Sequence, residues 1–340
     1  MQSLQKDLVS VLSPCYNMAG YIARLLDSIL IQTYPRIEMY VIDDGSSDGS
    51  ADIVASYIPR FEARGYRLTC IHQPNSGQSA AIQTGLQHVR GEYLVWPDSD
   101  DCYASADAIA KMAETLEQAS ARFAMVRIQE NMIEDGTDRI LHVAGTQAHE
   151  EEPQSLFEDC LFGTKKFYFG AGAYMIRTAT LFQTTELPIF TSKHAGQNWQ
   201  LLLPILHSYR CKTILEPLYN VTVRPASHSR GQYAGYEKEL CRIDTYEETL
   251  VETLKKIRNL PDTLRDRYTR EVRIDYLRKK YRLASAYGRK EDMAKSYDAL
   301  QCWNALRTKE RIGMTMVRLL GISAYCRVRS YAYKFYRRIR

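Results

Sequence analysis

The sequence lacks several features that would each assign the chain to a particular class of protein. No uninterrupted apolar run is long enough to span a bilayer, and the N-terminus lacks the basic segment and apolar core of a secretory signal. The eight cysteines stand singly, without a C-x-x-C pair, which argues against zinc and favours a reducing compartment. We therefore expect a cytoplasmic protein, or one held peripherally on the inner face of the cell membrane.

The glycine pattern of dinucleotide-binding enzymes is also missing. No G-x-G-x-x-G follows the first apolar run, so the sequence argues against a dinucleotide-dependent oxidoreductase. What remains is an ordinary globular composition, with 340 residues of which 45% are hydrophobic and 25% are charged. This length suffices for one large domain and an appendage.

Positive charge is concentrated at the C-terminus. The net charge is +5, and residues 301–340 contain ten basic residues and a single acid, Glu310. Apolar and aromatic residues alternate with Arg and Lys over residues 312–336, as in basic amphipathic helices that lie on anionic membranes. The alternative is a helix packed on the rest of the chain with a solvated basic face. Nothing else in the chain favours nucleic acid as a partner.

Four short apolar segments each end in a polar loop, and a helical pattern follows each loop. The expected strands are residues 8–14, 38–42, 66–71 and 92–96, and the expected helices are residues 22–30, 51–61, 78–89 and 104–119. This alternation predicts an α/β fold with a doubly wound parallel sheet. The four loops should then meet at the carboxyl edge of the sheet, where such folds bind ligands.

An acidic cluster follows the fourth expected strand. The apolar run stops at Pro97, and Asp98, Asp100 and Asp101 follow within four positions. Three carboxylates this close repel one another unless solvent, a neighbouring cation or a divalent metal compensates them. The cluster therefore identifies a candidate cation site at the sheet edge.

Taken in order, the four loops resemble a known family. Residues 13–17, 41–48, 75–81 and 98–101 are similar in type and spacing to the motifs of family 2 glycosyltransferases, which have the GT-A fold. The resemblance is strong over about the first 120 residues and weaker to about residue 230. It implies a GT-A domain at residues 1–230, in which helices flank a nucleotide-sugar-binding sheet. Residues 231–340 then form a helical C-terminal region with a basic aromatic tail.

The resemblance implies a nucleotide-sugar site on the first three loops. Ser13 and Tyr16 would lie on the loop against the nucleobase, and Asp44 would accept a hydrogen bond from the base. Asn75 and Gly77 would lie beside the nucleotide, where small residues permit close approach of the backbone. The plainer alternatives are that Tyr16 is an ordinary loop aromatic and Gly77 a simple turn residue.

The same resemblance implies a metal and a basic loop around the diphosphate. Asp98 would contact the ribose or the donor sugar, and Asp100 would bind Mn²⁺ or Mg²⁺ bridging the phosphates. Arg224 and His228 would belong to a basic loop that closes over the diphosphate, and His228 could complete the metal shell.

One position departs from the family pattern. Many relatives carry Gly-Glu-Asp-Trp before an apolar helix, with the aspartate as general base, whereas this sequence has Gln197 and Asn198 there. An amide has no useful basicity near neutral pH. Three explanations are open. Another group such as Glu216 or His194 could be the base, or the amides could do no more than orient the acceptor, with its proton leaving late. In the third, the chain binds nucleotide sugar without transferring it.

A segment of small residues at 170–176 allows two interpretations, namely close approach to the donor sugar or close packing between strands. Together with these residues, the family resemblance implies an inverting, metal-dependent glycosyltransferase. Its donor would be a nucleotide sugar, with a UDP-sugar favoured, and its acceptor a glycan or lipid-linked hydroxyl in bacterial surface polysaccharide synthesis. The alternative is a catalytically silent subunit that binds nucleotide sugar or glycan.

Overall fold

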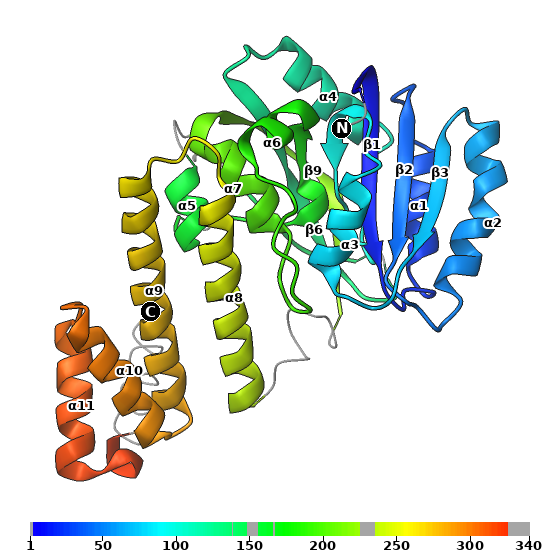
Figure 1. Cartoon of the computed structure of the whole chain (residues 1–340). Coiled ribbons are helices and arrows are strands. Elements are labelled where there is room, and N and C mark those ends of the chain that lie inside the picture. Colours follow the sequence, from blue (N-terminus) through cyan, green and yellow to red (C-terminus); the bar gives the residue numbers. More distant parts are fainter. Residues whose placement is uncertain (1–2, 138, 148–155, 166, 225–234, 326–340) are drawn as a thin grey trace. The chain divides into compact units, whose positions relative to one another are not determined.

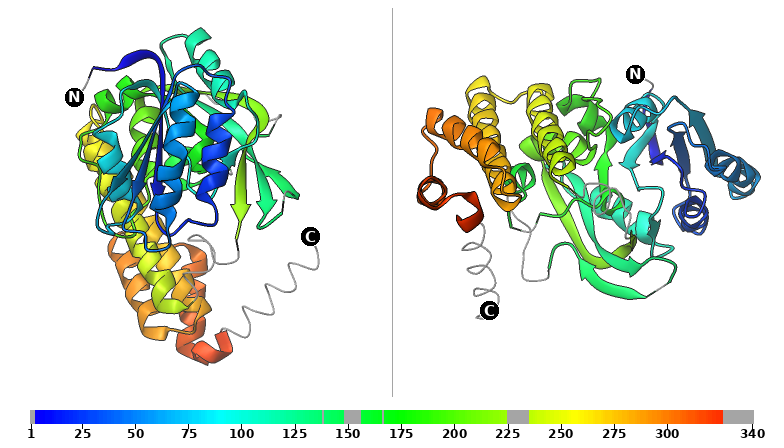
Figure 2. Two further views of the ribbon diagram at one scale, coloured as in Figure 1. Left: turned by 90° about the vertical axis from the view of Figure 1, so that its right-hand side faces the viewer. Right: turned by 90° about the horizontal axis from the view of Figure 1, so that it is seen from below.

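The computed structural model describes residues 3–137, 139–147, 156–165, 167–224 and 235–325 (Figure 1). Within these residues, one sheet of nine strands carries the first part of the chain, in the order β3-β2-β1-β4-β8-β6-β9-β5 with β7 paired to β6 (Figures 1 and 2). The strands are β1 (Gln5–Cys15), β2 (Ile37–Asp43), β3 (Arg67–His72), β4 (Gly91–Val95), β5 (Cys102–Tyr103), β6 (Phe123–Glu134), β7 (Ile140–Ala144), β8 (Tyr174–Arg177) and β9 (Arg210–Val223).

The α/β prediction is confirmed, because β1 to β4 pair in parallel. The chain moves outward from β1 through β2 to β3 and then returns to β4 on the other side of β1. The strand order therefore reverses next to β1, at the topological switch point where α/β sheets bind ligands. Beyond β4 the sheet is mixed, since β8 runs antiparallel to both β4 and β6.

Helices cover both faces of this sheet. They are α1 (Ile22–Leu30), α2 (Ser50–Ala63), α3 (Gln78–Leu86), α4 (Ala108–Gln118), α5 (Phe157–Phe162), α6 (Thr178–Thr184) and α7 (Asn198–Ser208), with a 3-10 turn at Ala171–Ala173. The helix expected from residue 104 begins at Ala108, because Cys102 and Tyr103 are extended and pair with β9.

The core lies between the sheet and its helices. The strands β1 and β2 are buried along most of their length, as expected for a parallel sheet covered on both faces. In α1, Leu25, Leu26 and Ile29 recur at helical spacing and are fully buried, and each such side chain contributes about 1.5–3 kcal/mol. This packing holds the carboxyl ends of the strands rigidly in place.

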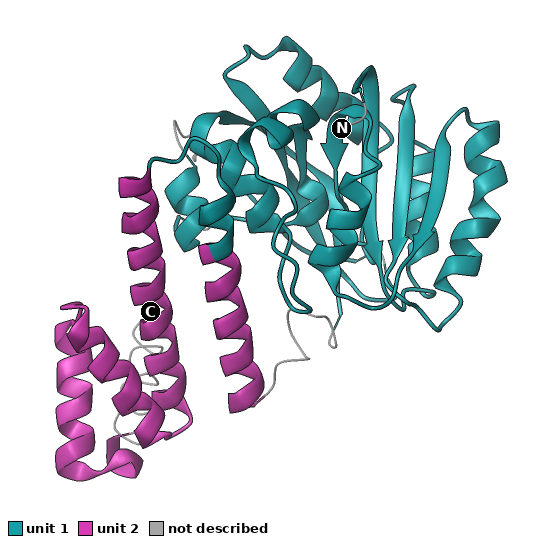
Figure 3. Ribbon diagram, in the orientation of Figure 1, with its two compact units in different colours: residues 1–225, 252–261 teal, residues 226–251, 262–340 magenta. Residues whose placement is uncertain are grey.

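The chain divides into two compact units (Figure 3). Unit 1 comprises residues 1–225 and 252–261, and unit 2 comprises residues 226–251 and 262–340. The division between residues 1–230 and 231–340 that the sequence suggests remains a prediction. The remaining helices are α8 (Tyr236–Lys256), whose last residues belong to unit 1, α9 (Asp262–Ala286), α10 (Lys290–Cys302) and α11 (Thr308–Leu320).

Unit 2 has a small core of its own. Tyr281, Ala284, Met293, Met314 and Val317 are buried together where α9, α10 and α11 meet. In the described parts of the chain, no helix combines the length and apolar character needed to cross a membrane. Of the predicted basic tail, residues 326–340 lie outside the described residues.

Candidate nucleotide-sugar site

The four polar loops meet at the carboxyl edge of β1 to β4. Backbone hydrogen bonds connect neighbouring loops, from Asp44 N to Cys15 O at 2.8 Å and from Gln73 N to Asp43 O at 2.9 Å. The convergence expected from the strand pattern is therefore present, and it lies at the switch point of the sheet.

The loop after β1 is fixed to the loop after β2. The Asn17 backbone N–H donates to Ser46 Oγ at 2.9 Å, and the Ser47 N–H donates to Asn17 Oδ1 at 2.9 Å. These bonds leave the adjacent Tyr16 side chain 47% exposed. Ser13 is buried, and its hydroxyl has no hydrogen-bond partner in the described residues. The loop thus presents an exposed aromatic ring at the carboxyl edge of the sheet, the same edge that carries the acidic cluster.

Asp44 organises the loop after β3. One of its carboxylate oxygens accepts from Gln73 Nε2 at 2.7 Å and Ser76 N at 2.9 Å, and the other accepts from Gly77 N at 2.8 Å. The side chain is buried. Three of roughly four acceptor positions of this carboxylate are used within the protein, so its contact with a base stays a prediction.

Gly77 lies against the segment before α7. Its φ is +93°, and a Cβ atom would lie only 2.4 Å from the Lys193 carbonyl oxygen. Asn75, two residues earlier, is exposed. Glycine at position 77 therefore allows the backbone of Lys193 to approach closely. The sequence alone does not reveal this contact.

Asp98 is held by two glutamine amides. Its Oδ1 accepts from Gln78 Nε2 at 2.7 Å and, more weakly, from Gln197 Nε2 at 3.4 Å. Burial and the neighbouring Asp100 carboxylate raise the pKa of Asp98 to about 7. Gln78 begins α3 and Gln197 precedes α7, so Asp98 links two helices to the end of β4.

Asp100 faces a positive charge. Its carboxylate is ion-paired with Arg224, and both side chains are 17% exposed. The Arg224 guanidinium also lies over the Tyr21 ring, 4.8 Å from its centroid, and Tyr21 donates to Asp135 at 3.1 Å. The sequence indicates Arg224 and Asp100 as separate phosphate and metal residues, and the structure brings them into direct contact.

Asp101 has a different role from its neighbour. It is buried, it accepts from the Thr222 backbone N–H at 2.8 Å, and the Thr222 hydroxyl donates to Asp100 O at 2.7 Å. Burial and the carboxylates of Asp100 and Asp98 raise its pKa. Thr222 thus fastens the end of β9 to the acidic loop, and no local pattern in the sequence signals that contact.

The Asn198 amide is hydrogen-bonded to the scaffold at both its oxygen and its nitrogen. Its Oδ1 accepts from Trp96 Nε1 at 2.9 Å, and its Nδ2 donates to the Phe169 carbonyl oxygen at 2.6 Å. A carboxylate could accept from Trp96 but could not donate to Phe169. Asparagine therefore suits this position for a structural reason.

Two other candidates for the base have different surroundings. Glu216 is ion-paired with Lys111 of α4 at 2.6 Å, and His194 is exposed on the segment before α7. His228 lies outside the described residues. In those that are described, no group of three or more His, Cys, Asp or Glu side chains is arranged to hold a metal alone.

The small-residue segment packs on two buried polar side chains. A Cβ on Gly170 would lie 1.4 Å from Glu130 Oε1, and one on Gly172 would lie 2.2 Å from the Tyr219 ring. Of the two interpretations of this segment, these contacts favour close packing. Neither Glu130 carboxylate oxygen nor the Tyr219 hydroxyl has a hydrogen-bond partner in the described residues.

Glu130 should make stability depend on pH. Burial and the nearby Asp98 raise its pKa, so its contribution to stability is complete below the unfolded pKa and is lost as pH rises through the folded pKa. Glu130→Gln cannot ionise, and we expect it to be more stable than wild type at pH 8, with the difference shrinking towards pH 5. Urea unfolding at several pH values measures this.

The control is Glu134→Gln at the end of the same strand. The hydrogen bond from Arg139 lowers the pKa of Glu134, so this variant should not gain stability at high pH. A gain for Glu130→Gln that is independent of pH would contradict the assignment.

Comparison with known proteins agrees with the fold. The family model described as glycosyl transferase family 2 matches residues 10–181. The chain is 31% identical over 159 residues to the putative teichuronic acid biosynthesis glycosyltransferase TuaG of Bacillus subtilis, covering 46% of this chain and 61% of TuaG. It is 42% identical over 98 residues to the glycosyltransferase GlyA of Streptococcus pneumoniae, covering 29% of this chain and 14% of GlyA. The matches thus span less than two thirds of either relative.

Solved structures share the fold at low sequence identity. TarS 1-349 of S. aureus, in complex with UDP-GlcNAc, has a TM-score of 0.65 and 17% identity, covering 96% of this chain and 92% of that chain. The mannosyltransferase PcManGT from Pyrobaculum calidifontis, in complex with GDP-Man and Mn²⁺, has a TM-score of 0.51 and 18% identity, covering 95% of this chain and 84% of that chain. The predicted GT-A fold with a helical C-terminal region is therefore confirmed.

The motif loops, the fold and the family model lead to one assignment. The family model covers half of the chain, from within β1 to beyond the end of β8. The chain belongs to glycosyl transferase family 2.

Proposed function

We propose that this chain transfers a sugar from a nucleoside diphosphate sugar to an acceptor hydroxyl, with inversion at the anomeric carbon. The observation that carries the proposal is the meeting of Asp98, Asp100 and Arg224 with the loops of β1 to β3 at one edge of the sheet. The bound UDP-GlcNAc and GDP-Man named for the two structural neighbours support a nucleotide-sugar donor.

The donor would lie across the first three loops. The exposed Tyr16 ring offers a face for the nucleobase, since aromatic rings stack on bases at little entropic cost. Ser13, Asn75 and Gly77 border the same edge, and Asp44 keeps the loop of Asn75 and Gly77 in position. Asp98 would contact the ribose or the donor sugar.

Asp100 would hold a divalent cation, Mn²⁺ or Mg²⁺, together with the donor phosphates. Its carboxylate is partly exposed and already faces a positive charge from Arg224. Mg²⁺ is often bound through one or two carboxylates and substrate phosphates rather than by a complete protein cage, so one carboxylate is a sufficient protein contribution. The cation would offset charge on the leaving diphosphate, and Arg224 supplies a second positive charge there.

On the acceptor side of the site, the amides of Gln197 and Asn198 would help to orient the acceptor. Asn198 and Gln197 are both hydrogen-bonded within the protein, which supports a role in shaping the site rather than in taking a proton. We favour direct displacement by the acceptor hydroxyl, with its proton lost late and no covalent enzyme intermediate. The alternatives remain a base such as His194 or Glu216, or no transfer at all.

Asn198→Asp tests this interpretation of the amide. The new carboxylate would face the Phe169 carbonyl without a proton to share, so we expect a loss of about 1–3 kcal/mol in the free energy of unfolding and no gain in turnover. Thermal unfolding and nucleoside diphosphate release measure the two effects. A variant that is stable and faster than wild type would show that an acid at this position is the preferred base.

Transfer itself is tested by incubating the full chain with UDP- and GDP-sugars, Mn²⁺, and simple or lipid-linked acceptors, and measuring nucleoside diphosphate release. Acceptor-dependent release supports the proposal. Tight donor binding without release for any acceptor would favour the catalytically silent subunit, for which Gln197 and Asn198 are the main support.

The biological setting is proposed by analogy. TuaG is named for teichuronic acid biosynthesis, which supports a glycan or lipid-linked acceptor in surface polysaccharide assembly. In α11, Ile312, Leu319 and Leu320 are exposed, which is compatible with peripheral membrane contact near the basic tail. The proposed domains are residues 1–230 for transfer and residues 231–340 as a helical C-terminal region, whose basic tail would make this contact.

A further inference from the structure

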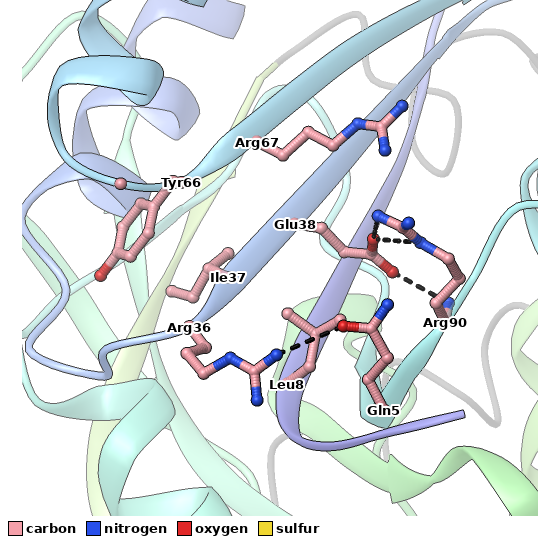
Figure 4. A pocket seen from close by; sticks show the side chains of 9 residues that line it. Gln5, Leu8, Arg36, Ile37, Glu38, Tyr66, Arg67 and Arg90 are labelled. Carbon is pink, nitrogen blue, oxygen red and sulfur yellow. Dashed lines mark hydrogen bonds and ion pairs between the residues drawn. The ribbon is translucent and has the colours of Figure 1, made fainter. Parts of the chain in front are cut away.

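The amino ends of four neighbouring strands enclose a hollow at the edge of the sheet opposite the loop site. It has a volume of about 230 Å³, and its walls include Gln5 of β1, Arg36 and Glu38 around the start of β2, Arg67 of β3 and Arg90 before β4 (Figure 4). Three arginines that are far apart in the sequence thus border one hollow, and one of them, Arg90, is paired with Glu38.

A buried network fixes Arg90. Glu38 is almost fully buried and accepts hydrogen bonds from Ser10 Oγ at 2.6 Å, Tyr40 Oη at 3.1 Å, and Arg90 Nε and Nη2 at 3.0 and 2.6 Å. Gly91 must be small here, because a Cβ would lie 2.5 Å from Ser10 N. Arg90 is therefore held through one side of its guanidinium (Figure 4), and its Nη1 makes no hydrogen bond within the described residues.

The hollow carries excess positive charge. Arg90 matches the charge of Glu38. Arg36 donates to the Lys6 carbonyl oxygen at 2.8 Å and to Gln5 Oε1 at 3.3 Å, both neutral acceptors. Neither Arg36 nor Arg67 has an ion-pair partner in the portion of the chain that is described, and both are exposed. Two guanidinium charges are therefore uncompensated, and a fixed donor lies beside them.

A second hollow of about 310 Å³ shares Arg67 and Arg90 with the first. Its walls add Tyr40, His88 and Thr69, and the Tyr40 and His88 rings lie 5.9 Å apart. Aromatic faces and a hydroxyl beside two arginines can receive the carbon skeleton of a ligand whose anionic group is bound by the arginines.

We propose that these joined hollows form a second binding site, specific for a phosphate ester. The phosphate would be bound by Arg67 and the free side of Arg90, with Arg36 at the rim, because guanidinium groups match phosphate oxygens in geometry and charge. The organic part would lie against Tyr40 and His88. This site is separate from the donor site, since it lies at the amino ends of the strands that carry the donor loops at their carboxyl ends.

Isothermal titration of the full chain tests the ligand chemistry with three probes. Glucose 6-phosphate should bind, inorganic phosphate should bind more weakly because it cannot reach the aromatic wall, and glucose should not bind. Equal binding of glucose and glucose 6-phosphate, or binding of neither, would overturn the proposal.

Variants test the location. Arg67→Gln should weaken glucose 6-phosphate binding by about tenfold, the expected loss of one charge-assisted contact. Arg67 has no ion-pair partner in the described chain, so its replacement should not disturb folding, as thermal unfolding can verify. Arg122→Gln, an exposed charge change on the same unit, and Arg224→Gln, at the opposite edge, should bind as wild type does. Loss in Arg224→Gln with retention in Arg67→Gln would place the ligand in the donor site and overturn the proposal.

The same phosphate chemistry occurs in lipid headgroups. Flotation with phosphatidylglycerol and phosphatidylcholine vesicles separates the two sources. If flotation requires both Arg67 and phosphatidylglycerol, and glucose 6-phosphate does not bind, the ligand of the site is a lipid headgroup and not a soluble phosphate ester.

Discussion

Asp100→Asn should lower kcat/KM for nucleoside diphosphate release by about 100-fold or more, the scale on which loss of one preorganised electrostatic contact acts. The amide keeps the size of the side chain but removes the charge that pairs with Arg224 and that would bind the divalent cation. The assay is nucleoside diphosphate release at saturating acceptor, with Mn²⁺ titrated from zero. Wild type should gain activity with Mn²⁺, and the variant should not.

The control for Asp100→Asn is Asp52→Asn, an equal change of charge at an exposed position in the first turn of α2. It should retain the wild-type rate. Turnover by Asp100→Asn equal to that of Asp52→Asn would refute the proposed metal residue. Turnover by neither variant nor wild type, with intact folding, would instead refute transfer, so the two failures can be told apart.

The contrast between Asp100 and Asp101 shows what the sequence can and cannot predict. The sequence places three acids after a buried strand, because an apolar run that ends in Pro97 is a local pattern. It does not tell which acid faces Arg224 and which is buried under Thr222, since both partners lie more than 100 positions away. The strands and loops of the first 100 residues can be predicted from the sequence because they, too, are marked by local patterns.

The Asn198 position shows a second limit. In the sequence it stands out only as an amide where relatives have an acid. The contacts to Trp96 and Phe169 depend on how β4, the segment before the 3-10 turn and α7 come together. The burial of Glu130 is not evident from the sequence, because it stands between Gln129 and Asn131 and a run of polar residues is usually assigned to solvent. At Glu130, β6 is paired with β7 through Ala144 and with β9 through Tyr219.

Gly77→Ala should be among the most destabilising single substitutions in unit 1. The residue has φ of +93°, and the added methyl would meet the Lys193 carbonyl oxygen at 2.4 Å. That atom belongs to backbone and cannot move without displacing the segment before α7. Strain of the left-handed region and overpacking together should cost about 3 kcal/mol or more, and the hydrogen bond from Gly77 N to Asp44 would be strained as well.

Gly49→Ala is the control for positive φ without a contact: Gly49 has φ +85° and ψ 7°, against ψ 164° at Gly77, and nothing lies within 4 Å of its added Cβ. It should cost only about 1–2 kcal/mol, the penalty of the left-handed conformation alone. Urea unfolding followed by tryptophan fluorescence compares the two, since Trp96 and Trp199 lie in unit 1. If both variants lose the same stability, contact with Lys193 contributes nothing, and Gly77 is a simple turn glycine. If Gly77→Ala loses more, the excess combines the backbone strain at ψ 164° with the contact of the added methyl with Lys193, both of which require glycine in this loop.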